Sequence, residues 1–87
     1  MTAVKPIKYT AHAETVIYER QLERAWIEDA VHMPDWREAD SSSSAVERRF
    51  RIIHERGDRV LRVVCVETAD EIRIISAFLD RRAKRPT

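Results

Sequence analysis

His12 and Arg20 are the residues whose types and spacing best combine into a chemical site. On a helix they lie two turns apart and lean the same way. Arg20 falls on an apolar stripe, where a charge is costly unless it is paired or partly solvated. One interpretation is a structural arginine that bridges a helix to a strand carboxylate or carbonyls, with His12 as a capping or packing residue. The other is a cation that binds a phosphate, with His12 moving a proton near neutral pH.

Arginines in the predicted strands form a second set of candidates. A guanidinium binds two phosphate oxygens at once, so such residues could build an RNA-binding face. The alternative is that alternate charged residues are simply the solvated face of a strand. This set of substrate-binding candidates is Arg49, Arg51, Arg62 and Arg73. The tail at 81–85 is either an electrostatic arm or a solubilising terminus.

Several other chemistries lack the residues that they need. A single glycine excludes a P-loop and a glycine-rich dinucleotide-binding turn. The histidines show no metal-ligand spacing, and Cys65 has no partner cysteine. Cys65 also lies in the most apolar segment of the chain, which favours an inert core thiol over a nucleophile or redox group. We therefore expect no metal site and no cofactor.

Length and composition point to one small globular domain over residues 1–87, with a core at about 8–80. Hydrophobic residues make up 44% and charged residues 36% of the 87 positions, which excludes intrinsic disorder. The net charge of +1 does not by itself indicate a nucleic-acid binder. Basic residues nevertheless gather in the second half, which indicates either a basic face or mutual attraction of the halves. The chain has no apolar leader or spanning segment, so we expect a cytoplasmic protein without membrane partners.

The helical part is predicted to consist of two short helices with a corner at Gln21. Thr10 is a good N-cap for a helix over 11–20. The apolar stripe changes phase after Gln21, which indicates a second helix over 23–32. Pro34 then ends that helix.

The second half of the chain is predicted to form the sheet. Period-2 alternation and turn residues indicate strands over 46–54, 60–67 and 71–79, with a weak edge segment at 35–40. The segment 60–67 is almost continuously apolar, which is typical of a central strand covered on both faces. Residues 41–44 read as an exposed serine loop and 81–87 as a basic tail. The expected fold is α+β, with two N-terminal helices packed on a three- to four-stranded antiparallel sheet.

Several short motifs resemble one bacterial family. The run Thr10-Ala11-His12-Ala13, then Glu19-Arg20, Leu22, 27–31 and Met33-Pro34, is similar to the domain of unknown function 4258 family. The resemblance covers about residues 8–80, although Gln21 and Glu23 stand where the family tends to have Gly and Ser or Thr. Segment 59–67 is similar to the family's sheet, and 72–77 also resembles the last strand of BrnT-type toxins. Grouping with BrnT-like and RelE/ParE-like toxins implies a barnase–RelE type of fold and RNA cleavage.

Two functions follow as hypotheses. The first is a toxin-like, metal-independent endoribonuclease, or an inactive relative of one, with RNA as its ligand. His12 and Arg20 would be its catalytic residues. The second is a non-catalytic interaction module, whose sheet edge or helix face binds an antitoxin protein or a second copy of the chain.

Overall fold

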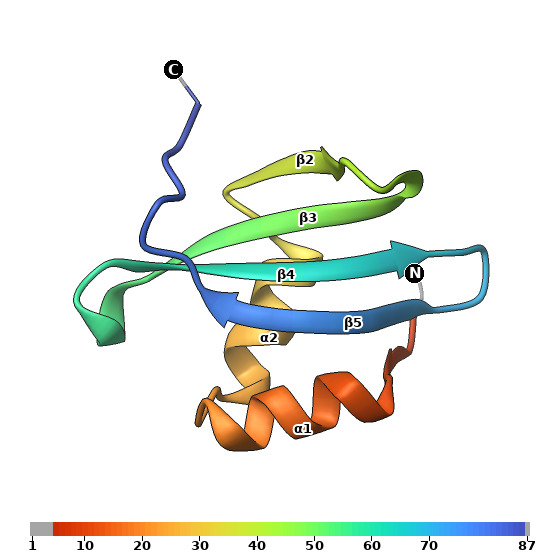
Figure 1. The fold of residues 1–87 in the computed structure, drawn as a ribbon, viewed down its shortest axis with the longest axis horizontal. Helices are drawn as coiled ribbons and strands as arrows, with labels where there is room; N and C mark the ends of the chain where they lie inside the picture. The colour runs from red at the N-terminus through yellow and green to blue at the C-terminus, as the bar shows by residue number, and fades with distance from the viewer. Residues whose placement is uncertain (1–4, 87) are drawn as a thin grey trace, which may run out of the picture.

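The computed structural model describes residues 5–86 and contains two helices and five strands (Figure 1). The short strand β1 (Ile7–Tyr9) leads into α1 (Ala11–Glu19) and α2 (Arg24–His32). The remaining elements are β2 (Trp36–Asp40), β3 (Ser43–Ile53), the 3-10 turn η1 (His54–Arg56), β4 (Arg59–Glu67) and β5 (Ile72–Leu79). The α+β class and the two N-terminal helices are therefore confirmed.

The corner between the helices is formed by residues with distinct local roles. The Thr10 hydroxyl caps α1 by accepting a hydrogen bond from the Ala13 amide at 3.1 Å. At the other end, Gln21 adopts the left-handed region with φ of 55°. This turn shifts the helical phase, so that Leu22 is buried beside Ile17 in the core. The corner is thus made at the cost of an unfavourable backbone conformation in a non-glycine residue.

Replacing Gln21 with glycine is expected to stabilise the protein. Glycine adopts a positive φ without steric conflict, although it also gains entropy in the unfolded chain. The net effect should be an increase of about 0.5–1 kcal/mol in the free energy of unfolding. Urea denaturation followed by circular dichroism measures this difference. A Gln21→Gly variant that is less stable than the wild type would contradict the assigned strain.

The sheet differs from the expected three- to four-stranded antiparallel arrangement, and that prediction was wrong. The structure has a five-stranded mixed sheet in the order β1-β5-β4-β3-β2. Strand β1 pairs parallel to β5, with Ile7 opposite Ile72 and Tyr9 opposite Ile74. A strand of three residues is too short to show a period-2 pattern. Its partner also lies at the far end of the chain, so no local turn signal announces the pairing.

Both helices lie on the same side of the sheet (Figure 1). Their apolar faces pack on alternate residues of the central strands, and β4 is central as predicted. The buried cluster consists of Ala13, Ile17, Leu22, Trp26, Ile27, Ala30, Val31, Ile53, Leu61, Val63, Cys65, Ile72, Ile74 and Ala77. Within residues 5–86, no helix covers the opposite face of the sheet. The expectation that β4 is covered on both faces therefore holds for one face only.

The remaining connections are short. Ser41 and Ser42 form the turn between β2 and β3, and β3 already begins at Ser43. The carboxylate of Asp40 holds this turn by accepting from the Ser42 amide at 3.0 Å. Strand β2 forms one edge of the sheet and pairs antiparallel with β3. After β5, the chain makes a turn at 81–82 and continues without regular structure to Pro86.

Candidate nucleic-acid interface

The α1–α2 corner, the β3–β4 turn and the end of β5 lie at the same end of the sheet (Figure 1). A groove opens among side chains of these segments. Its volume is about 440 Å³. The lining residues are Arg20, Leu22, Arg56, Arg59, Phe78 and Leu79. Three arginines and three apolar side chains, one of them aromatic, therefore line this site, which we call the arginine groove.

Arg20 reaches the groove from the C-terminal end of α1. Its Nη1 donates to the Ala77 carbonyl at 2.7 Å, and its guanidinium lies 5.7 Å from the centroid of the Phe78 ring. Strand β1 pairs with β5 only at 72–74, so the Ala77 carbonyl lies at an unpaired stretch of the edge. Arg20 thus has the structural role of satisfying a carbonyl, as one interpretation of the sequence proposed. Its side chain also keeps donors free for a ligand.

Arg56 and Arg59 complete the cationic wall. Arg56 extends from the β3–β4 turn and packs 5.6 Å from the Trp26 ring centroid, while Arg59 begins β4. Among residues 5–86, no carboxylate lies within 4.0 Å of the guanidinium groups of Arg20, Arg56 or Arg59. Their charges are therefore not neutralised within the described chain, which favours anion binding. Sequence reasoning missed Arg56 and Arg59, although both flank the only glycine in a predicted turn.

The arginines of the predicted strand set do not share one face. Arg49 lies opposite Val63 of β4, on the side covered by the helices. Arg62 lies opposite Phe50, on the other side of the sheet. Arg51 shares the side of Arg49, whereas Arg73 lies opposite Val66 on the side of Arg62. A continuous RNA-binding face made of all these residues is therefore not present.

Arg49 is held inside the protein by its own acceptors. The residue is 2% exposed. Its guanidinium donates to Glu47 at 2.8 Å, to the Val31 carbonyl at 2.8 Å and to Glu67 at 2.6 Å. Hydrogen bonds from Lys5 and Arg49 lower the pKa of Glu67 to about 2. Arg49 therefore joins the end of α2 to β3 and β4, and its burial keeps its guanidinium away from a substrate.

The other strand arginines are also engaged. Arg51 donates to the Met33 carbonyl at the end of α2. Arg73 pairs with Glu71 at 3.0 Å, at the far end of β5 from the arginine groove. Arg62 pairs with Asp80 at 3.2 Å and lies 5.0 Å from the Phe78 ring centroid. Of the predicted strand set, only Arg62 contacts a residue that lines the groove.

The structure separates His12 from Arg20. His12 is exposed near the start of α1, and its side chain makes no hydrogen bond to residues 5–86. The rise of a helix places its Cα about 12 Å along the axis from that of Arg20. Figure 1 shows that the start of α1 points away from the groove end of the sheet. His12 and Arg20 are therefore not assembled into one compact site.

A second histidine lies closer to the arginine groove in the fold. His54 is in the same turn as Arg56, and its Nδ1 lies 2.6 Å from the Asp58 carboxylate. A carboxylate at Nδ1 orients an imidazole and leaves Nε2 free to accept a proton, as in histidine general bases. Sequence reasoning did not single out this pair, although a spacing of four residues across a turn could have indicated it. Cys65 is not a candidate nucleophile, because burial raises the pKa of its thiol to about 11.

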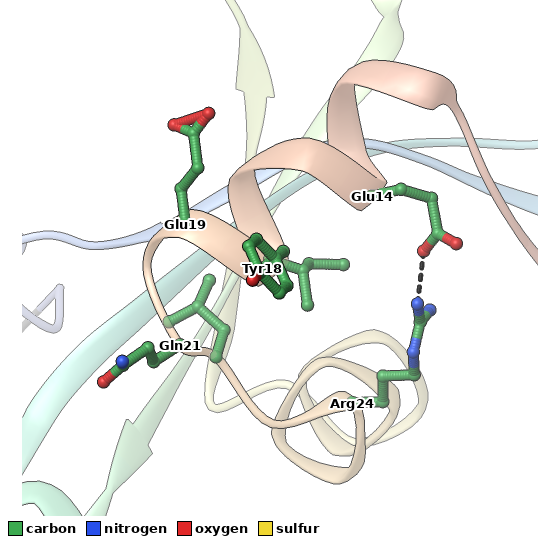
Figure 2. Close-up of a pocket in the computed structure, with 7 residues that line it drawn as sticks. Glu14, Tyr18, Glu19, Gln21 and Arg24 are labelled. Carbon is green, nitrogen blue, oxygen red and sulfur yellow. Dashed lines mark hydrogen bonds and ion pairs between the residues drawn. The ribbon is translucent and has the colours of Figure 1, made fainter.

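A hollow of about 570 Å³ lies between α1 and α2 (Figure 2). Figure 2 shows the ion pair between Glu14 and Arg24 across this hollow, with Glu19 pointing away from both. Tyr18, at its rim, is 85% exposed. The carboxylates and the neutralised arginine make this hollow unsuited to phosphate. The arginine groove is therefore the better candidate for a nucleic-acid ligand.

Comparison with known proteins identifies the family. The domain of unknown function DUF4258 matches residues 9–79, which span every helix of the structure and the whole of β2–β5. The chain belongs to this family. The match includes the groove residues Arg20, Arg56, Arg59 and Phe78, so the groove is part of the DUF4258 domain itself. No curated protein and no solved structure matches this chain.

Neither helix of the DUF4258 domain is both long and apolar enough to span a bilayer. Over residues 5–86, the histidine, cysteine, aspartate and glutamate side chains form no cluster of three or more that could hold a metal ion.

Proposed function

We propose that this DUF4258 domain binds single-stranded RNA in the arginine groove. The observation that supports the proposal is the convergence of Arg20, Arg56 and Arg59, which have no carboxylate partner among residues 5–86, on a groove that Phe78 also lines. Sites for single strands combine cations for the phosphates with aromatic rings for the bases. Only unstacked bases can reach such a ring, which favours a single strand over a duplex. RNA is proposed over DNA on the sequence motifs alone, which predicted a RelE/ParE-like or BrnT-like toxin.

The low net charge of the chain is compatible with this proposal. Many of its other arginines are neutralised by carboxylates, as in the pairs of Arg24, Arg37, Arg48, Arg49, Arg62 and Arg73. Within residues 5–86, Arg20, Arg56 and Arg59 have no carboxylate partner and lie at one end of the sheet, where Arg81 and Arg82 also follow β5. Local charge and not the overall sum determines the attraction of a phosphate within a Debye length of about 8–10 Å.

Fluorescence anisotropy with a labelled single-stranded RNA of about 12 nucleotides tests the binding. We expect the logarithm of the binding constant to fall with the logarithm of the salt concentration, with a slope of about −2. Each phosphate contact releases about 0.7 counterions from a single strand, so contacts by Arg20, Arg56 and Arg59 together give this slope. A duplex of the same sequence should compete weakly. Absence of binding at low salt, or a slope near zero, would contradict the proposal.

We further propose that the domain cleaves the bound RNA without a metal ion, as a toxin-like endoribonuclease. In metal-independent cleavage, a base removes the proton of a 2′-hydroxyl, and the 2′-oxygen attacks the adjacent phosphorus. The P–O5′ bond breaks, the 5′-oxygen takes a proton from an acid, and a 2′,3′-cyclic phosphate remains. The groove arginines would stabilise the charge that develops on the phosphate. His54, oriented by Asp58, is the proton-transfer group that the geometry favours, while His12 stays the prediction from sequence.

Induced expression in a bacterial host separates these assignments. Growth and total RNA would be followed together for the wild type, His54→Ala and His12→Ala. We expect the wild type to arrest growth and to produce new RNA ends, and we expect His54→Ala to abolish both. Retained activity in His54→Ala with loss in His12→Ala would reassign the role to His12. Normal growth and intact RNA with the wild type would contradict the cleavage proposal, and RNA binding would then be the function that is still proposed.

A further inference from the structure

The face of the sheet opposite the helices carries an apolar centre. Val60 and Val64 of β4 lie on this side, because they alternate with Leu61, Val63 and Cys65, whose side chains face the helices. Their partners in β3 are Ile52 and Arg48. We call five of the half-buried apolar side chains here the open-face patch: Ile52, Val60, Val64, Val66 and Ile75. At its β4–β5 end, Val66 and Ile75 line a hollow of about 390 Å³. A central strand that is apolar on both sides is typical of a sheet with both faces covered.

Three arginines around the patch are each paired with a carboxylate of the same chain. Arg48 pairs with Asp40 at 2.8 Å, and Arg62 pairs with Asp80 at 3.2 Å. Their side chains are 14–23% exposed, so these pairs are already largely withdrawn from water. Arg73 pairs with Glu71 at the hairpin end. The surface that approaches this face therefore meets an apolar centre and a balanced rim, which disfavours a strongly charged partner.

We infer that the partner of this face is a second copy of the chain, packed sheet against sheet. A two-fold axis through the centre of β4 would place the open-face patch of one copy on that of the other. Among residues 5–86, the arginines of this face are paired with carboxylates and Glu38 at the β2 edge is the unpaired charge, so the centre of the interface needs no opposite charge on the partner. Sheets pack about 10 Å apart with strands within about 30° of each other, and β-branched side chains interdigitate between them. The patch consists of valines and isoleucines that suit this packing.

The dimensions of the face indicate a reversible dimer. Strand β4 has nine residues and spans about 30 Å, and neighbouring strands are about 4.8 Å apart. Four strands therefore offer a footprint on the order of 500–600 Å² per copy. That is about a tenth of the 5898 Å² surface of the chain and lies at the lower end for specific interfaces. Dissociation in the micromolar range is expected.

Sedimentation velocity over a range of roughly micromolar to submillimolar concentrations tests this inference. We expect the wild type to shift from monomer to dimer and Val64→Glu to remain monomeric throughout. Tyr18→Glu is the matched control, because it adds the same charge at an exposed helical site, and it should dimerise like the wild type. A monomeric wild type at every concentration would overturn the inference, and so would a Val64→Glu variant that dimerises normally.

A second variant and a dilution experiment keep the test valid if Val64→Glu unfolds. Val66→Arg places a charge on the same face near the hairpin end, and folding of each variant is checked by circular dichroism. Amide chemical shifts of the wild type should change on dilution in β4 and β5 and stay constant in α2. Concentration-dependent shifts confined to the edge strand β2 would indicate pairing through that edge and would overturn sheet-on-sheet packing.

Discussion

Simultaneous replacement of Arg20, Arg56 and Arg59 by glutamine is expected to weaken the binding of single-stranded RNA by about a hundredfold. Each substitution removes a charge-assisted contact to a phosphate, worth roughly 1 kcal/mol at an exposed site. The three losses together correspond to about two orders of magnitude in affinity. The salt dependence of the remaining binding should also decrease to nearly zero. Anisotropy titrations at one fixed salt concentration measure the loss directly.

The control for this variant changes the net charge by the same amount elsewhere. Arg24, Arg37 and Arg73 are each paired with a carboxylate and lie outside the arginine groove. Their joint replacement by glutamine should reduce the affinity by less than about threefold, because these side chains lie outside the groove, and the loss of exposed ion pairs changes the stability of the fold little. Equal losses in the two triple variants would show that RNA responds to overall charge, and the groove assignment would then be wrong.

Arg49→Met is expected to be the most destabilising single substitution at an arginine of this protein. It removes the hydrogen bonds that Arg49 donates to the Val31 carbonyl, Glu47 and Glu67, while Lys5 still donates to Glu67 and Arg37 to Glu47. Removing one partner of a buried ion pair costs about 3–5 kcal/mol. The carboxylates of Glu47 and Glu67 are about one third exposed and can regain some water, so we expect a loss of about 2–4 kcal/mol. Urea denaturation of both proteins measures it.

The pH dependence of this difference provides an internal check. The pKa of Glu67 is about 2 in the folded protein and 4.5 in the reference state. Its contribution is therefore present above pH of about 4.5 and is lost as the pH falls toward 2. The difference in the free energy of unfolding between wild type and Arg49→Met should therefore decrease as the pH falls over this range. Arg51→Met, which loses one bond to a carbonyl, should cost less than about 1 kcal/mol. Near-equal stabilities of Arg49→Met and wild type would contradict the structural role.

Local signals in the sequence account for what could be predicted. The Thr10 cap, the change of helical phase at Gln21 and the proline at 34 each act within a few residues, and they define both helices correctly. The apolar run at 60–67 gave the central position of β4, because a strand with apolar residues on both sides needs neighbours. Arg20 could be singled out because a charge on an apolar stripe requires a partner.

The parts that the sequence did not reveal depend on contacts between distant segments. The parallel pairing of Ile7 with Ile72 joins the two ends of the described chain. Which face an arginine occupies depends on the register between strands, and that register places Arg49 and Arg62 on opposite sides of the sheet. The arginine groove likewise combines a helix corner, a turn and a strand end. Arg56 and Arg59 become candidate binding residues only because the fold places them in the same groove as Phe78.

The most direct test of the RNA-binding proposal is a heteronuclear NMR titration of the wild-type protein with a short single-stranded RNA. Amide and arginine side-chain resonances would be followed at low salt. The proposal predicts that the changes cluster at Arg20, at 56–59 and at Phe78, and that they reverse as salt is added. Changes confined to the hollow between α1 and α2, or no changes at all, would contradict the assignment of the arginine groove as an RNA site.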